Sequence, residues 1–193
     1  MPILNSTLGY GALTKVFHWL IAFLFALQYV SATIMLRTPA EATTLGLDQA
    51  TYYNWHKSLG LVALAVAVAR LLNRRAGTLP PWAPTLTALE QMIIHRAEQL
   101  LYAAMFIMPV SGFLYVMAGG YGVRLFGLFD LPNPIPSSPL LASAAKWVHV
   151  ATAMLLLLPL GTHLGLVLGH HFGLRDRLID RMLPVRSSPA KSP

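Results

Sequence analysis

Seven histidines stand in a chain of 193 residues whose side chains are mostly apolar, and their positions are the first sign of chemistry. An ionisable side chain inside a membrane is costly, so it usually has a function there. His149 and His163 are 14 residues apart. On a helix this spacing returns them to within about 40° of one face and separates them by about 21 Å along the axis. One helix would therefore present an imidazole near each surface of a bilayer.

Each of these two imidazoles has a possible partner at its own depth on another helix. If the chain starts on the cytoplasmic side, His18 lies at the level of His163, and His56 lies at the level of His149. A six-coordinate b haem takes one axial imidazole from each of two helices. The four residues therefore predict two b haems, one between His56 and His149 and one between His18 and His163. His95 is an alternative to His18 as a ligand.

Other interpretations of the histidines are weaker. A lone imidazole near a membrane surface more often caps a helix or bonds a carbonyl group than binds a metal. Zinc is the rival metal, but it prefers three or four convergent ligands in a tetrahedron, which two distant pairs do not supply. The chain has no cysteine, which excludes disulfides, iron–sulfur clusters and haem attached through a C-x-x-C-H motif.

The elements that must position these histidines are four long apolar stretches, near residues 14–36, 56–73, 93–118 and 145–169. Each approaches the roughly 20 residues that a helix needs to cross a bilayer. Inside lipid such spans must be helical, because only a helix satisfies its own backbone groups. The predicted fold is an all-α integral membrane protein, a four-helix transmembrane bundle. We expect one domain over residues 1–184 and a disordered cytoplasmic tail over residues 185–193.

The charge pattern predicts the orientation of the bundle. The net charge of +7 could suggest nucleic acid as a partner, but the basic residues gather beside the ends of the apolar stretches, so the membrane explains them better. Cytoplasmic loops of membrane proteins are enriched in Lys and Arg. The cation-rich segments are the second loop and the C-terminal region, which places both termini in the cytoplasm. The basic residues there are Arg70, Arg74, Arg75, Arg96, Arg175, Arg177, Arg181, Arg186 and Lys191.

Several short segments carry a resemblance to a known family. They are Phe17-His18-Trp19, Trp55-His56-Lys57-Ser58-Leu59-Gly60, Arg70-Leu71-Leu72, Lys146-Trp147-Val148-His149, His163, His170-His171 and Met182-Leu183-Pro184. In this order and spacing the chain resembles the bacterial cytochrome b561 family, over nearly its whole length. One departure is that relatives often carry H-x-x-H at the start of the third span, where this chain has His95 followed by Glu98.

The resemblance implies a protein of the bacterial inner membrane that oxidises superoxide at the periplasmic face and reduces ubiquinone. Lys146 would attract the superoxide anion, and Lys57 and Arg124 could add to the same field; snorkelling of Lys146 at the interface is the alternative. His170 matches the quinone-side histidine and would donate protons. The residues that could help to position the quinone are Arg70, His95 and Glu98, with haem propionates or lipid phosphate as alternative partners of Arg70.

Two other functions remain open at this stage. Similar diheme bundles serve as membrane anchor subunits, which relay electrons between a periplasmic dehydrogenase or hydrogenase and quinone. Such a subunit would have a periplasmic redox partner and would purify with it. The second alternative is a non-redox membrane protein whose histidines bind zinc or only pack, and a visible spectrum without haem bands would identify it.

Overall fold

In the computed structural model, residues 2–183 are described, and four of their helices are long and apolar enough to cross a membrane. They are α1 (Ala12–Arg37), α2 (Gln49–Ala76), α3 (Ala88–Ala118) and α4 (Pro139–Leu168). The predicted membrane bundle of four helices is confirmed. The predicted tail over residues 185–193 lies outside the described residues.

The helices begin earlier in the chain than the apolar stretches predicted, and in α2, α3 and α4 the first turn is capped by a polar side chain. The Asp48 carboxylate accepts a hydrogen bond from the backbone N–H of Thr51, at 2.7 Å, and starts α2. Thr87 and Glu90 form a capping box at the start of α3. Ser138 caps α4, whose first residue is Pro139. Such caps satisfy the free N–H groups of a first helical turn, but they carry no hydropathy signal.

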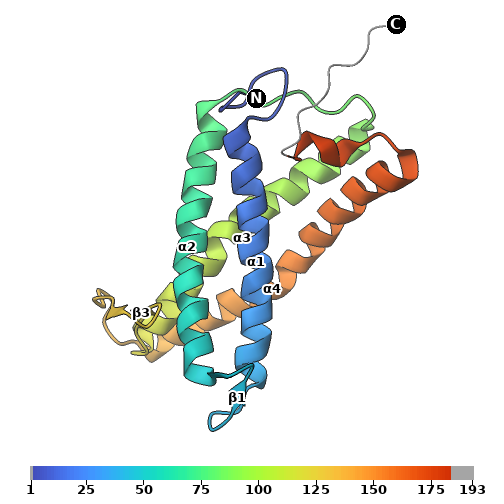
Figure 1. Ribbon diagram of the computed structural model, residues 1–193. Coiled ribbons are helices and arrows are strands. Elements are labelled where there is room, and N and C mark those ends of the chain that lie inside the picture. The colour runs from blue at the N-terminus through green and yellow to red at the C-terminus, as the bar shows by residue number, and fades with distance from the viewer. Residues whose placement is uncertain (1, 184–193) are drawn as a thin grey trace, which may run out of the picture.

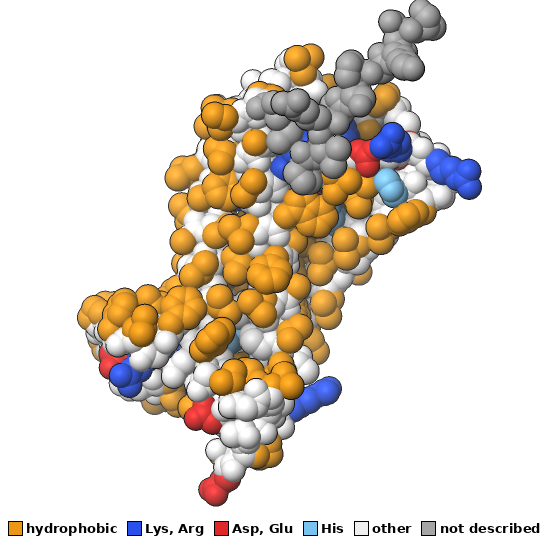
Figure 2. Space-filling model, in the orientation of Figure 1, with side chains coloured by type: hydrophobic (Ala, Val, Ile, Leu, Met, Phe, Trp, Pro, Cys, Tyr) orange, Lys and Arg blue, Asp and Glu red, His pale blue; other side chains and the backbone are white. Residues whose placement is uncertain are grey.

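The helices pack as two pairs, α1 against α2 and α3 against α4, and Figure 1 shows the second pair crossing the first at an angle. A small apolar core joins α1, α2 and α3, made by Ile21, Leu24, Ala63, Ala67 and Met105. Figure 2 shows hydrophobic side chains over the middle of the molecule and charged side chains toward its ends. This distribution matches a bundle whose middle lies in lipid.

The two ends of the bundle differ in their connections (Figure 1). At one end, which we call the hairpin end, two short antiparallel hairpins join the helices: β1 (Thr43–Thr44) with β2 (Leu47–Asp48), and β3 (Arg124–Leu125) with β4 (Phe129–Asp130). The other end carries the start of α1 and the segment after α4, and we call it the terminal end. The all-α prediction missed these hairpins, whose strands are only two residues long.

The long loop between α3 and α4 packs against α2 at the hairpin end. The backbone N–H of Phe126 donates to Ser58 Oγ at 2.8 Å, and Lys57 Nζ donates to the carbonyl of Gly122 at 3.0 Å. Val123 of the loop is buried in a cluster with Val116 and Met117. The loop therefore covers the part of α2 that carries His56.

After α4 the chain folds back across the terminal end. A π-helical turn, η1 (Gly169–Leu174), follows α4 directly, and a 3-10 turn, η2 (Leu178–Arg181), comes after it. The buried Lys15 donates to the carbonyl of Leu183 at 2.8 Å, and the Trp19 indole donates to that of Met182 at 2.9 Å. These bonds hold the segment after α4 on the first turns of α1.

Candidate functional site

Four histidines form two pairs that bridge the gap between the helix pairs. His18 of α1 faces His163 of α4, with 6.2 Å between the ring centroids and 57° between the ring planes. His56 of α2 faces His149 of α4 at the same centroid distance, 6.2 Å, and 83°. The first pair lies toward the terminal end and the second toward the hairpin end. The structure thus brings together the partners that depth matching predicted.

The spacing within each pair fits a metal ion held between two imidazoles. Metal–nitrogen bonds of about 2 Å on either side would place the two ring centroids about 6 Å apart. Among residues 2–183, no group of three or more His, Asp or Glu side chains is placed to hold a metal ion. Each pair can therefore supply only two ligands, and a flat macrocycle such as porphyrin would supply the other four. This donor set fits haem and does not fit tetrahedral zinc.

At the hairpin end, hydrogen bonds orient both imidazoles for metal binding through Nε2. His149 Nδ1 lies 2.8 Å from the carbonyl oxygen of Met108, so it must carry a proton and donate. His56 Nδ1 lies 3.1 Å from Ser31 Oγ, and that hydroxyl donates its own proton to the carbonyl of Gln28 at 3.0 Å. Ser31 must therefore accept from His56 Nδ1. In both rings Nε2 is left unprotonated, the form that a metal ligand needs.

A mostly apolar cavity opens beside the His56–His149 pair, with about 860 Å³ of space between atoms, including its mouth. Gly112 on α3 leaves room for this ring, because a Cβ at this position would lie 3.0 Å from two atoms of the His149 ring, closer than an ordinary contact. Gly60 on α2 also lines the cavity.

Beside the His18–His163 pair, His163 Nδ1 and Arg70 Nη1 are buried and have no hydrogen-bond partner among the described residues. Arg70 donates to the Tyr102 hydroxyl at 3.2 Å, and its Nη2 lies 3.4 Å from His18 Nδ1. A guanidinium only donates, so His18 Nδ1 would have to accept in this contact. If His18 held a metal through Nε2, its Nδ1 would carry a proton, and Arg70 would have to turn toward another acceptor, such as a haem propionate.

The other predicted residues of this region lie apart from the histidine pair. Glu98 pairs with Arg74 at 3.7 Å. His95 is exposed on α3, where its Nε2 lies 3.1 Å from the side-chain nitrogen of Gln99. The structure therefore favours His18 over His95 as the partner of His163. Sequence reasoning missed Tyr102, whose ring lies under the guanidinium groups of both Arg70 and Arg74.

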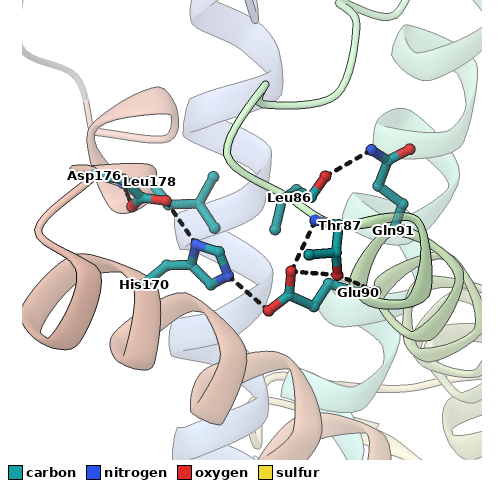
Figure 3. A network of polar contacts seen from close by, with 7 residues as sticks. All are labelled: Leu86, Thr87, Glu90, Gln91, His170, Asp176 and Leu178. Carbon is teal, nitrogen blue, oxygen red and sulfur yellow. Dashed lines mark hydrogen bonds and ion pairs between the residues drawn. The ribbon is translucent and has the colours of Figure 1, made fainter.

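His170 lies in η1 and is buried between two carboxylates, as Figure 3 shows. Its Nδ1 is 2.6 Å from Asp176 Oδ2, and its Nε2 is 3.1 Å from Glu90 Oε1. Burial alone would raise the pKa of Asp176, but hydrogen bonds from Thr85, His170 and the Leu178 backbone hold that pKa below its ordinary value. Sequence reasoning missed both carboxylates, although the Thr87-to-Glu90 spacing of a capping box was readable.

The predicted cations lie around the hairpin end in different settings. Lys146 is exposed on α4, one turn before His149, and Arg124 is exposed on β3. Lys57 is half-buried and lines the cavity beside His56. Of the three, Lys57 is thus the cation in direct contact with the candidate cofactor cavity.

Four membrane helices with two facing histidine pairs define a membrane cytochrome of the b type. The family model of prokaryotic cytochrome b561 matches residues 9–185, and the chain belongs to this family. Cytochrome b561 homolog 2 of Escherichia coli is 27% identical over 97% of this chain and 98% of its own length. The probable superoxide oxidase CybB of Yersinia pestis is 26% identical over 91% of this chain and 96% of its own length. The family confirms a bacterial membrane protein with b-type haem that transfers electrons.

Proposed function

We propose that this protein oxidises superoxide at its hairpin end and reduces ubiquinone at its terminal end, through two b haems. The observation that carries the proposal is the 6.2 Å spacing within each of two histidine pairs at different depths. The likeness to a protein named probable superoxide oxidase supports the choice of superoxide. The cations of the terminal end, such as Arg74 and Arg75, support a cytoplasmic location for that end and an inner-membrane location for the protein.

When bound, each haem would supply an iron that accepts and releases one electron. The protein's part is to hold and orient the two groups. His56 and His149 would bind the first, their rings fixed by Ser31 and the Met108 carbonyl. His18 and His163 would bind the second, with Arg70 as partner of an acidic substituent. The apolar lining of the first cavity would keep water away from the site.

The reaction balances with one electron from each donor molecule. Two superoxide anions each lose one electron and leave as oxygen, and one ubiquinone takes up the two electrons and two protons to become ubiquinol. Lys146, Lys57 and Arg124 would draw the anion toward the hairpin end. His170 would provide protons at the terminal end, where it borders an open groove between α3 and α4 that could receive the quinone ring.

The decisive experiment is stopped-flow mixing of the purified oxidised protein with superoxide, with and without ubiquinone-1. We expect the haem absorbance to show rapid reduction without quinone and turnover with quinone. Superoxide that leaves the haems oxidised would disprove the proposed donor. Haems that superoxide reduces but quinone does not reoxidise would disprove the proposed acceptor.

A membrane anchor subunit is the second candidate, and the β3–β4 hairpin offers a surface where its redox partner could bind. Leu128 and Phe129 at this hairpin are 76% and 53% exposed, at the end of the bundle that would face the periplasm. Exposed apolar side chains of this kind can contact either lipid or a protein partner. Purification with a soluble iron–sulfur subunit, together with no reaction of the isolated protein with superoxide, would support this function instead.

Lys146→Glu tests the attraction of superoxide. We expect the second-order rate of haem reduction by superoxide to fall about tenfold at low ionic strength, because the anion then meets a like charge near the site. The difference from wild type should shrink as salt is added. Stopped-flow rates over a range of ionic strength provide the measurement. Arg75→Glu makes the same charge change at the terminal end and should leave this rate unchanged; an equal effect there would contradict local steering.

Gly112→Val tests the space around His149. Since even a Cβ would lie 3.0 Å from the His149 ring, a valine should displace the imidazole and weaken binding of the hairpin-end haem. We expect the haem content to fall toward one per chain in the pyridine haemochrome assay. Gly161→Val is the control, because a Cβ there meets nothing within 4 Å. Gly161 is two residues from His163, which places the two on nearly opposite sides of α4. A haem content of two in both variants would contradict the packing argument.

A further inference from the structure

The ring of His170 carries two protons in the geometry of this site. Both ring nitrogens lie within hydrogen-bond distance of a carboxylate, Asp176 on one side and Glu90 on the other. An ionised carboxylate only accepts hydrogen bonds, so both ring nitrogens must donate. The ring is therefore held as an imidazolium cation between two anions, and it is almost fully buried.

The two carboxylates differ in what they can reach. The Asp176 side chain is 7% exposed, and its second oxygen accepts a hydrogen bond from the backbone N–H of Leu178 at 3.1 Å. The Glu90 side chain is 25% exposed. Its Oε2 accepts from the backbone and the hydroxyl of Thr87 at 2.8 and 2.7 Å, which leaves Oε1 directed at His170 (Figure 3). Asp176 thus fixes the buried Nδ1 side of the His170 ring, and Glu90 connects its Nε2 side to the surface.

The exposed side of Glu90 borders the open groove between α3 and α4. The groove is also lined by Ile93, Thr162, Gly165 and Gly169. A Cβ built at either glycine would meet nothing within 4 Å, so this side of α4 leaves space beside its backbone. A flat ring could therefore lie against α4 with Glu90 and His170 at its edge.

We propose that Glu90 is the proton-transferring residue between His170 and a quinone in this groove, with Asp176 as a positioning residue for the imidazolium. The inference rests on the proposed function, since it assumes that quinone is the acceptor. In each transfer the His170 Nε2–H bond breaks, the proton moves through Glu90 Oε1 to a quinone oxygen, and an O–H bond forms there. His170 then regains a proton from water through Glu90, the more exposed of its two carboxylate partners. Two such protons accompany the two electrons that superoxide supplies.

The test measures reoxidation of chemically reduced haems by ubiquinone-1 between pH 5 and 9, in the full-length protein carrying its haems. Glu90→Gln keeps the size and an accepting oxygen but cannot carry the proton, so we expect reoxidation to slow by roughly 10²-fold. Asp176→Asn keeps the relay and removes one anion beside His170. We expect the reoxidation rate of this variant to approach that of the wild type at low pH. The rate should decline at a lower pH than in the wild type, because the imidazolium of His170 loses one of its two stabilising anions.

Controls separate this role from a structural one. Haem reduction by superoxide without quinone should be unchanged in Glu90→Gln, because that half of the reaction occurs at the hairpin end. Glu90→Asp keeps a carboxyl group and should recover a measurable part of the quinone rate. Asp180→Asn removes a carboxylate from the Arg177–Asp180 pair of the same end and should behave as wild type.

The outcomes distinguish the two proposals. If ubiquinone-1 reoxidises wild type and Glu90→Gln with the same pH profile, or if Glu90→Asp is no faster than Glu90→Gln, the proton relay is wrong while quinone reduction stands. If ubiquinone-1 does not reoxidise wild type at any pH, quinone is not the acceptor and the proposed function fails first.

Discussion

His149→Ala should remove the hairpin-end haem and leave the other in place. His149 faces His56 across 6.2 Å, and its Nδ1 is fixed by the Met108 carbonyl, so alanine removes one of the two oriented imidazoles of this pair. The variant should hold one haem per chain in the pyridine haemochrome assay, against two in the wild type. Because superoxide is proposed to react at this end, reduction of the remaining haem should become at least 10²-fold slower.

The matched control for this variant is His149→Met. A thioether can still bind haem iron but donates no hydrogen bond to Met108. We expect it to recover haem to some degree with a changed spectrum, whereas alanine does not. Two haems per chain in His149→Ala, with the wild-type spectrum, would show that His149 is not a ligand.

His163→Ala should remove the terminal-end haem and separate the two halves of the reaction. The hairpin-end haem keeps both of its ligands, so superoxide should still reduce it at close to the wild-type rate. Electrons should then have no path to quinone at the terminal end, and turnover with ubiquinone-1 should fall by at least 10²-fold. Stopped-flow spectra with and without quinone, together with the haem count, provide the measurement.

His95→Ala is the comparison that identifies the partner of His163. The structure leaves His95 exposed beside Gln99 and sets His18 against His163, so this variant should retain two haems and His18→Ala should retain one. The reverse result would mean that His95 is the ligand. If haem reduction by superoxide were lost in His163→Ala but kept in His149→Ala, the two ends would have been assigned in the wrong order.

The sequence by itself determined the number of helices, their span and the depth of each histidine. The rise of a helix is fixed at 1.5 Å per residue, and the bilayer has a fixed thickness, so a position in a span is also a level in the membrane. The 14 residues between His149 and His163 therefore predicted two levels, and the structure places His56 and His18 at them. The ends of the helices were predicted less well, because polar caps such as Asp48 extend them beyond the apolar residues.

Only the tertiary structure decided which side chains meet at each level. A helix in lipid can rotate about its axis and tilt, and side-chain packing between distant segments selects the final arrangement. That packing turned His95 outward, brought Gly112 against His149, and placed Arg70 beside His18. It also closed Glu90, His170 and Asp176 into one cluster, across 80 residues of chain. None of these contacts follows a helical repeat, so no local pattern in the sequence could have predicted them.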